Sequence, residues 1–277
     1  MQEKGGFSMV IHVVQPGDSL YRIAQLHSVP LPFLIQQNEL HEPYRLTPGQ
    51  TIVVPQPEKT YIVRRGDTLG SIAAQNGTTV IQLWQNNPQL GGTDRIQLGQ
   101  MLVLSYGNKL GRFAVNGYAY PSINTNSLNC VLPFLTFLSP FSYKLTPTAE
   151  LVSPDDSDLI FRAQRSAVMP IMVVTNIFDK GFSTEVLSVI LASEELQERL
   201  IGNILSELTG KNYYGVNMDI EYIAPDDRDR YNAFLERLAE RLHNEGFIVM
   251  SALAPKISAD QPGVLYDCLL YTSPSPR

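Results

Sequence analysis

The chain has 277 residues, of which 44% are apolar and 17% are charged, and its formal net charge is −6. This composition is typical of a folded globular protein and excludes a disordered chain. No run of Lys or Arg could neutralise successive phosphates, and neither the two Cys nor the four His have metal-ligand spacing, so we expect no nucleic acid, metal or cofactor.

Residues 1–8 lack the apolar core of a signal peptide, and strand-like residues follow at once from Met9. We interpret residues 1–8 as a disordered or mis-started extension. Elsewhere, no apolar run approaches the roughly 18 residues that a membrane-spanning helix needs. The sequence therefore predicts no membrane partner.

An internal repeat follows, with an offset of 49 residues. The Gly-Asp-Ser-Leu sequence at 17–20 aligns with Gly-Asp-Thr-Leu at 66–69, and Ile-Ala at 23–24 aligns with Ile-Ala at 72–73. Asn38 aligns with Asn87, and a Gly-Gln pair recurs at 49–50 and 99–100, at an offset of 50 after one inserted residue. Repetition at a fixed period indicates two copies of one structural unit.

Each unit is predicted to fold as strand, helix, helix, strand. In the first unit the strands are expected at residues 10–14 and 51–54, and the helices at residues 20–27 and 32–38. Asp18 or Ser19 can cap the first helix. A Pro-rich linker at residues 55–59 is expected to join this unit, residues 9–55, to the second, residues 60–106.

The repeated motifs resemble the lysin motif (LysM), a module that binds N-acetylglucosamine in glycans. The resemblance implies binding in a groove between the first strand–helix loop and the second helix–strand loop. The implied binding residues of the first unit are Gly17, Asp18, Ser19, Leu20, Thr47, Pro48 and Gly49. Those of the second unit are Gly66, Asp67, Thr68, Leu69, Gln97, Leu98 and Gly99. Asp18 and Asp67 equally suit a purely structural capping role, and the single Trp, Trp84, suits the core.

After residue 111 strand-like and helix-like segments alternate, which predicts a parallel α/β domain. Strands are expected near residues 113–120, 135–143, 169–175, 215–222 and 247–252. Amphipathic helices are expected at residues 191–208 and 227–245. The fold class predicted for the chain is thus two small βααβ modules followed by a partial (β/α)8 barrel.

Polar groups concentrate on the predicted strand at residues 215–222. Because side chains alternate along a strand, Asn217, Asp219 and Glu221 share one face, while the opposite face is apolar. Barrel enzymes place their catalytic groups at the carboxyl ends of such strands. The strand is therefore a candidate catalytic strand; an exposed edge strand with solvated acids is the alternative interpretation.

This strand resembles the D-x-x-D-x-D-x-E signature of glycoside hydrolase family 18, the chitinase-like barrel enzymes. Tyr214 and Asn217 stand where that signature has its first and second Asp. The domain order further resembles spore-cortex-lytic and spore-coat peptidoglycan hydrolases with N-terminal LysM modules. The resemblance implies substrate-assisted cleavage with retention, in which Glu221 protonates the glycosidic oxygen and Asp219 stabilises the substrate acetamido group. Asn217 would hydrogen-bond Asp219.

The resemblance also places Tyr118, Tyr120 and Met250 near the sugar, although each equally suits core packing. Residues 112–267 hold about five of the eight units of a complete barrel. Residues 268–277 fit neither a strand nor a helix, and we interpret them as a non-native tail. The domain is therefore expected to be unfinished, and the chain inactive by itself.

The leading hypothesis is a peptidoglycan-binding glycosidase of the spore coat, cortex or cell wall. A chitinase is the second, because the motifs are common to enzymes of chitin and of peptidoglycan. A non-catalytic glycan-binding coat protein is the third. The presence of both Asp219 and Glu221 favours an enzyme, because binding alone does not require that pair.

Overall fold

The computed structural model describes residues 9–42, 44–107, 113–179 and 181–253. The proposed extension at 1–8 and the proposed tail at 268–277 lie outside these residues. By its contacts the chain divides into two units, residues 1–113 with 124–134, and residues 114–123 with 135–277. Among the described residues, no helix is long and apolar enough to cross a membrane.

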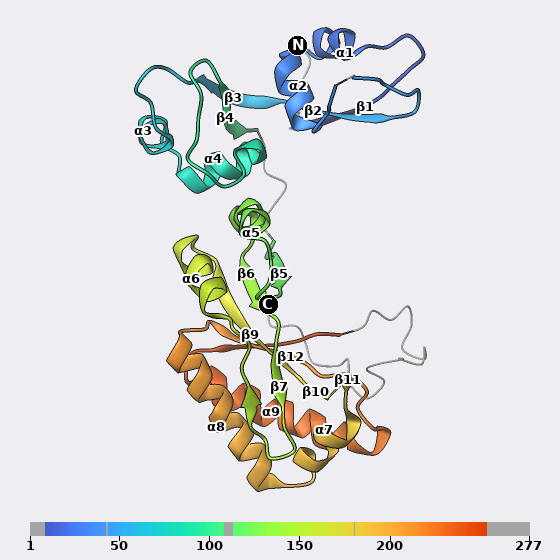
Figure 1. Ribbon diagram of the computed structural model, residues 1–277, viewed down its shortest axis with the longest axis vertical. Coiled ribbons are helices and arrows are strands. Elements are labelled where there is room, and N and C mark those ends of the chain that lie inside the picture. Colours follow the sequence, from blue (N-terminus) through green and yellow to red (C-terminus); the bar gives the residue numbers. More distant parts are fainter. Residues whose placement is uncertain (1–8, 43, 108–112, 180, 254–277) are drawn as a thin grey trace, which may run out of the picture. The chain divides into compact units, whose positions relative to one another are not determined.

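The first repeat packs two short helices against an antiparallel pair of strands, as predicted (Figure 1). Its elements are β1 (Met9–Val13), α1 (Leu20–Leu26), α2 (Leu31–Gln37) and β2 (Thr51–Pro55). The strands pair in register from Met9 with Pro55 to Val13 with Thr51. Ser19 is the residue that caps α1, since its hydroxyl accepts the backbone N–H of Arg22 at 3.3 Å.

The second repeat has the same order of elements. They are β3 (Pro57–Ile62), α3 (Leu69–Gln75), α4 (Val80–Asn86), the short 3-10 helix η1 (Pro88–Leu90) and β4 (Met101–Tyr106). Thr68 and Thr79 each begin a helix with a capping box, in which the side chain three residues later accepts the backbone N–H of the Thr.

The repeated Asn ties the end of the second helix to the closing strand. The amide of Asn87 donates to the carbonyls of Leu83 and Val103 at 2.8 Å and accepts the N–H of Val103 at 2.8 Å. Asn38 makes the equivalent contacts with Leu34 and Val53. The side chain thus satisfies backbone groups that the two-stranded sheet leaves unpaired, which explains why both repeats carry Asn here.

The expected linker at residues 55–59 was wrong. β2 extends to Pro55 and β3 begins at Pro57, so only Gln56 separates the two strands. Pro57 is tolerated because it is the first residue of its strand, beside a register irregularity. The repeats also share contacts: Val103 of β4 is fully buried in the core of the first repeat, and Gln37 donates to Gln89 at 3.2 Å. The two repeats therefore form one packed unit.

The 124–134 segment, which follows the first strand of the α/β domain, groups with the repeats. It forms α5 (Thr125–Val131) and the 3-10 helix η2 (Leu132–Phe134). The side-chain amide of Gln85 on α4 donates to the carbonyl of Pro133 at 2.6 Å. At Gly92, with φ +65°, an added Cβ would lie 2.3 Å from the carbonyl oxygen of Asn129. Glycine is thus required where this segment approaches the second repeat.

The second unit is a parallel α/β domain, as predicted. Its strands are β5 (Asn116–Ala119), β6 (Phe137–Pro140), β7 (Tyr143–Leu145), β8 (Leu151–Val152), β9 (Met169–Thr175), β10 (Ile177–Phe178), β11 (Gly181–Phe182), β12 (Gly215–Asp219) and β13 (Ile248–Ser251). Its helices are α6 (Ser157–Arg165), α7 (Thr184–Leu191), α8 (Glu194–Lys211), η3 (Pro225–Asp227) and α9 (Arg228–Asn244). The predicted helix at residues 191–208 begins later, because Ser193 caps α8 after α7 has ended.

The main sheet has the order β13-β12-β9-β6-β5, in which every neighbouring pair is parallel. β7 continues the line of β6, since both pair with β9. Adjacent strands therefore follow chain order, as in successive βα units of a (β/α)8 barrel. Within the described residues the sheet does not close into a barrel.

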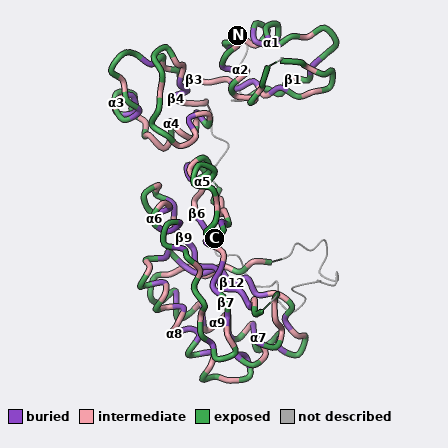
Figure 2. Tube along the Cα trace, viewed as in Figure 1, coloured by how far each residue is buried: buried purple, intermediate pink, exposed green. Residues whose placement is uncertain are grey.

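One face of the sheet is covered by helices. Val216, Met218 and Ile220 are buried in a core that includes side chains of α7, α8 and α9. Figure 2 shows β9 and β12 buried along most of their length. Because residues alternate, Asn217 and Asp219 face away from these helices. The packing of the apolar face thus decides which side carries the polar groups.

A polar cluster lies within the helix-covered layer. The Asp156 carboxylate is 1% exposed, accepts the hydroxyls of Tyr143 and Tyr213 at 2.6 and 2.7 Å, and pairs with Lys211 at 2.9 Å. Burial alone would raise the pKa of Asp156, but these three donors outweigh it and lower the pKa. Burial, and then the hydrogen bond to Asp156, raises the pKa of Tyr143 to about 12. The cluster is therefore a satisfied ion pair that ties α8 to the start of α6.

Candidate functional site

The predicted catalytic strand lies inside the sheet, and its polar side chains are largely enclosed. Asn217 is 2% exposed and Asp219 is 9% exposed. In the parallel register, Asn217 pairs with Met250 on β13, and Asp219 pairs with Thr175 on β9. Met250 therefore lies beside Asn217 on the same face of the sheet. The family resemblance implies that this residue lies near the sugar.

Glu221 lies beyond the strand, because β12 ends at Asp219 rather than continuing to Tyr222. The backbone of Glu221 is instead held by Asn176, whose side-chain carbonyl accepts its N–H at 3.0 Å and whose amide donates to its carbonyl at 2.8 Å. Thr184 donates to the carbonyl of Tyr222 at 2.6 Å, and Tyr222 itself has φ 56°. The tight turn after Asp219 is thus set by contacts from Asn176, directly after β9, and from Thr184 at the start of α7.

Aromatic side chains at the carboxyl ends of β5 and β6 face Asp219. Tyr118, Tyr120 and Phe141 line a pocket of about 350 Å3 together with Ala119 and Asp219. Phe141 packs edge-on against both tyrosines, with ring centroids 6.3 Å from Tyr118 and 5.3 Å from Tyr120. An apolar wall beside a carboxylate suits a sugar ring, whose C–H face is apolar and whose rim is polar.

Tyr118 links the aromatic wall to the catalytic strand. The amide of Asn217 donates to the Tyr118 hydroxyl at 2.5 Å. Burial raises the pKa of Tyr118, as does the nearby charge of Asp219, although the hydrogen bond from Asn217 acts in the opposite direction. The phenol therefore stays protonated at neutral pH and keeps a proton to donate.

The structure thus gathers Asp219, Tyr118 and Tyr120 around one pocket, while Asn217 is joined to it through its hydrogen bond to Tyr118 and has Met250 beside it. Sequence reasoning missed Phe141 and Asn176. Asn176 directly follows the buried strand β9. A polar residue at the carboxyl end of a parallel strand is a sequence pattern that could have identified it as a site residue. Phe141 follows β6 in the same way.

The loops predicted to bind glycan lie side by side in both repeats. In the first, Val14 exchanges backbone hydrogen bonds of 2.8 and 2.9 Å with Gln50 and Gly49. In the second, Val63 makes the equivalent bonds with Gln100 and Gly99. Gly49, with φ +89°, has the left-handed conformation that favours glycine at such a turn. The backbone therefore places the first strand–helix loop against the second helix–strand loop.

Asp18 and Asp67 have structural partners within these loops. The Asp18 carboxylate accepts hydrogen bonds from the backbone N–H of Gln15 at 2.8 Å and from a ring nitrogen of His12 at 3.0 Å. Asp67 accepts the N–H of Arg64 at 2.7 Å and the hydroxyl of Tyr61 at 2.9 Å. Both carboxylates thus close the turn that precedes the first helix, and the capping itself falls to the next residue.

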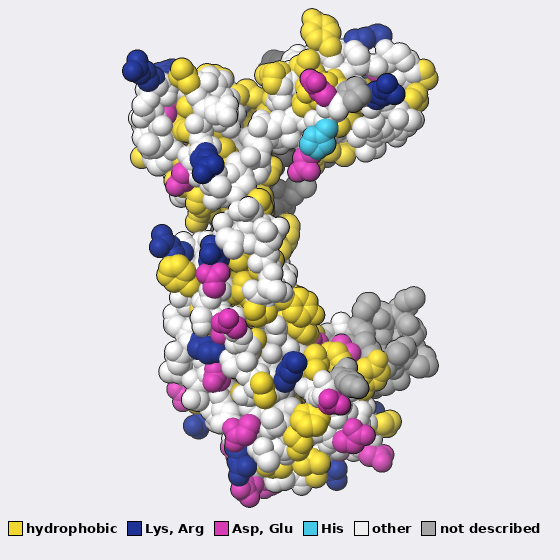
Figure 3. Space-filling view, in the orientation of Figure 1, with side chains coloured by type: hydrophobic (Ala, Val, Ile, Leu, Met, Phe, Trp, Pro, Cys, Tyr) yellow, Lys and Arg dark blue, Asp and Glu magenta, His cyan; other side chains and the backbone are white. Residues whose placement is uncertain are grey.

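A hollow in the second repeat is lined by four of its seven predicted binding residues. Asp67, Thr68, Leu69 and Gln97 all line it, while Leu98 nearby is 75% exposed. Of the residues predicted in the first repeat, Asp18 lines a smaller hollow next to α1. Among the described residues, no three His, Cys, Asp or Glu side chains gather as metal ligands would. Figure 3 shows Lys and Arg dispersed over the visible face rather than gathered into a patch.

Comparison with known families identifies the two repeats. Residues 12–55 and 61–105 each match the LysM domain family. The two repeats are LysM domains. The match ends near residue 105, so it does not include the α/β domain.

Relatives extend the similarity across both units. A cortical fragment-lytic enzyme of Bacillus subtilis is 35% identical over 263 residues, covering 75% of this chain and 60% of the relative. Its Bacillus anthracis counterpart is 30% identical, covering 93% of this chain and 61% of the relative. The crystal structure of the Bacillus cereus spore cortex-lytic enzyme SleL is 30% identical, with a TM-score of 0.68, covering 92% of this chain and 60% of that structure. The chain thus spans about 60% of the length of these relatives.

Proposed function

We propose that the protein is a peptidoglycan-binding glycoside hydrolase that cleaves N-acetylglucosaminyl linkages in spore cortex or cell wall. The observation that carries this proposal is the pocket in which Asp219, at the carboxyl end of β12, faces the aromatic wall of Tyr118, Tyr120 and Phe141. The names of the relatives, which describe lysis of cortex and of cortical fragments, support the same substrate.

In the proposed mechanism the substrate supplies its own nucleophile. Glu221 donates a proton to the glycosidic oxygen while the carbonyl of the 2-acetamido group attacks the anomeric carbon. Asp219 orients the acetamido N–H and stabilises the positive charge that develops on that group. Water then opens the oxazolinium ring, Glu221 recovers its proton, and the configuration is retained. Asn217 and Tyr118, joined by their hydrogen bond, position the acetamido group from one side.

The LysM domains would hold the enzyme on its insoluble substrate. Their paired loops are shallow and rich in backbone groups, as suits recognition of a neutral sugar. Binding through two domains keeps the catalytic pocket near the polymer between turnovers, which raises the effective substrate concentration.

Glu221→Gln tests the proposed mechanism. In a version of the protein extended to the length of its relatives, it should lower the release of muropeptides from purified cortex by about 10²- to 10⁴-fold, the usual effect of losing a general acid. Asp219→Asn should be comparably severe. Both variants should still sediment with peptidoglycan. Wild-type turnover by Glu221→Gln would mean that another residue is the general acid, whereas no turnover by the unaltered extended protein would favour a non-catalytic binding protein.

We also propose that the 277-residue chain alone is inactive, because a (β/α)8 barrel needs eight units to close and enclose its site. The same muropeptide assay applied to the 277-residue chain should show binding to cortex without cleavage. Turnover equal to that of the extended protein would contradict this proposal.

A further inference from the structure

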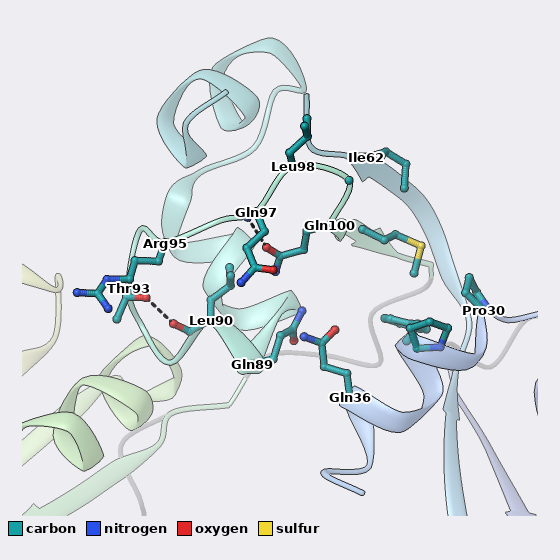
Figure 4. Close-up of a pocket in the computed structure, with 14 residues that line it drawn as sticks. Pro30, Gln36, Ile62, Gln89, Leu90, Thr93, Arg95, Gln97, Leu98 and Gln100 are labelled. Carbon is teal, nitrogen blue, oxygen red and sulfur yellow. Dashed lines mark hydrogen bonds between the residues drawn. The ribbon is translucent and has the colours of Figure 1, made fainter. Parts of the chain in front are cut away.

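A groove of about 710 Å3 lies between the two LysM domains and is bordered on one side by the second domain's loop at residues 97–100. One wall is α2 of the first domain, and the other is the loop that leads into β4 of the second (Figure 4). The domains are held together beside it by the burial of Val103 and by the Gln37–Gln89 hydrogen bond. The groove is therefore a product of their packing, and neither domain alone would form it.

The lining of the groove has the chemistry of a polar glycan site. Gln36 from the first domain and Gln89 from the second point toward one another across it (Figure 4). The side-chain amides of Gln36 and Gln97 make no hydrogen bond to a residue that the structure describes, so they can pair with acetamido and hydroxyl groups. Ile62 and Leu98, which are 52% and 75% exposed, add apolar surface for the C–H face of a sugar.

Arg95 carries the charge at one end of the groove, where its guanidinium points away from Gln36 and Gln89 (Figure 4). It is the charged residue among those that line it, and no Asp or Glu contributes. Its guanidinium forms no ion pair within the described parts of the chain. Arg95 and Gln97 also line the hollow that holds Asp67 and Thr68, so the two cavities share a wall.

We propose that this groove binds a continuation of the glycan strand held by the second LysM domain, and that Arg95 pairs with a carboxylate on that strand. The inference rests on the glycan-binding part of the proposed function. Peptidoglycan carries carboxylates on the peptide stems of its muramic acid residues, and on their lactyl groups where the stem has been removed, whereas chitin is uncharged. Arg95 would therefore favour peptidoglycan over chitin, a choice that the LysM motif and the catalytic strand leave open.

The repeat supplies a matched control. Arg45 occupies the position equivalent to Arg95 in the first domain, at an offset of 50 residues, but does not line the groove. Replacing either arginine by Gln removes one positive charge from the equivalent loop of its own domain. A difference between the two variants therefore reports on the groove rather than on net charge.

The experiment is titration calorimetry of the full chain with two soluble probes of equal length. One is an oligomer of N-acetylglucosamine, and the other alternates N-acetylglucosamine with N-acetylmuramic acid bearing a free carboxylate. Arg95→Gln should weaken binding of the muramic probe about three- to fivefold, the effect of a partly exposed ion pair, and leave the neutral probe unchanged. Gln36→Glu should also weaken the muramic probe, through repulsion, whereas Arg45→Gln should change neither.

Equal losses of affinity for the muramic probe in Arg45→Gln and Arg95→Gln would overturn the inference. It would also be overturned if the unaltered chain binds both probes and neither Arg95→Gln nor Gln36→Glu changes the affinity for the muramic probe. Binding of neither probe by the unaltered chain would instead overturn the glycan-binding function on which the inference rests.

Discussion

Asn176 holds Glu221 by both of its backbone polar groups, accepting its N–H at 3.0 Å and donating to its carbonyl at 2.8 Å. Asn176 is fully buried and also donates to the carbonyl of Ser183 at 3.0 Å. One side chain of the β9 loop thus sets the position of the proposed general acid, which lies on a turn rather than on a strand.

Replacing Asn176 by Ala should release that turn. In the extended enzyme we expect kcat on cortical muropeptides to fall by about 10²-fold, since displacement of a catalytic group by about 1 Å has effects of this size. KM should change little, because Asn176 does not line the pocket. Asn203→Ala, which removes a partly exposed amide bound to the carbonyl of Ala149, is the control for loss of an Asn. A rise in KM without a loss of kcat would contradict the positioning role.

The two repeated asparagines should differ in their contribution to stability. Asn87 is fully buried, so Asn87→Ala leaves the backbone groups of Val103 without water or protein partners, at a cost of about 2–4 kcal/mol. Asn38 is partly exposed, and Asn38→Ala should cost less because water can replace its contacts. Amide hydrogen exchange at Val103 and Val53 measures both effects, and equal losses would show that burial does not decide the difference.

The pH dependence of the α/β domain should include a contribution from Asp156. Its pKa is lowered in the folded state, so its contribution to stability is present above the unfolded value of about 4 and is lost as pH falls through the folded pKa. Asp156→Asn should lower the free energy of unfolding at pH 7 by about 2–3 kcal/mol, because Lys211 and the tyrosine hydroxyls lose a charged acceptor while Lys211 keeps Glu207 at 3.5 Å. It should also reduce the loss of stability at acid pH. Thermal melts at pH 7 and pH 3.5 test this. Asp158→Asn, at an exposed ion pair with Arg162, is the control and should have little effect.

The first LysM domain should be more sensitive to mild acid than the second. Burial, and then the charge of His12 at 3.2 Å, lowers the pKa of His27. A lowered pKa favours the neutral ring in the folded state, so this stability is full above about pH 6.5 and declines as pH falls through the folded pKa. Asp18, which bonds His12, and nearby Arg22 are the other charged groups that contribute to this site.

The second domain provides the comparison, since Tyr61 and Asn76 occupy the positions of His12 and His27 at the offset of 49. Tyr61 keeps the bond to the turn carboxylate at 2.9 Å. The double variant His12→Tyr, His27→Asn should therefore remove the acid sensitivity of the first domain. Hydrogen exchange of the turn amide of Gln15 at pH 7.5 and pH 5 measures it, and unchanged sensitivity would assign the effect to other groups.

Periodicity in the sequence predicted the strands of the repeats and the main parallel strands of the second unit to within a few residues, because apolar alternation and helical stripes are local properties. The short strands β8, β10 and β11 were not predicted, and the strand expected at residues 135–143 is divided into β6 and β7. It also predicted that Asn217 and Asp219 share a face opposite Met218. The contacts of Asn176 with Glu221, and of Phe141 with the tyrosines, could not be predicted, since they join segments far apart in the chain. The two prolines at 55 and 57 were misinterpreted because edge strands tolerate proline where its missing N–H is not needed.

The burial of Val103 in the core of the preceding repeat limits how this architecture can change during evolution. A repeat of this kind cannot be exchanged, deleted or duplicated as a free cassette, because its neighbour would lose part of its own interior. With Gln56 alone between β2 and β3, insertions at the junction would also alter the pairing that begins at Pro57. Substitutions at the two faces of the junction should therefore accumulate together, as they do within a single domain.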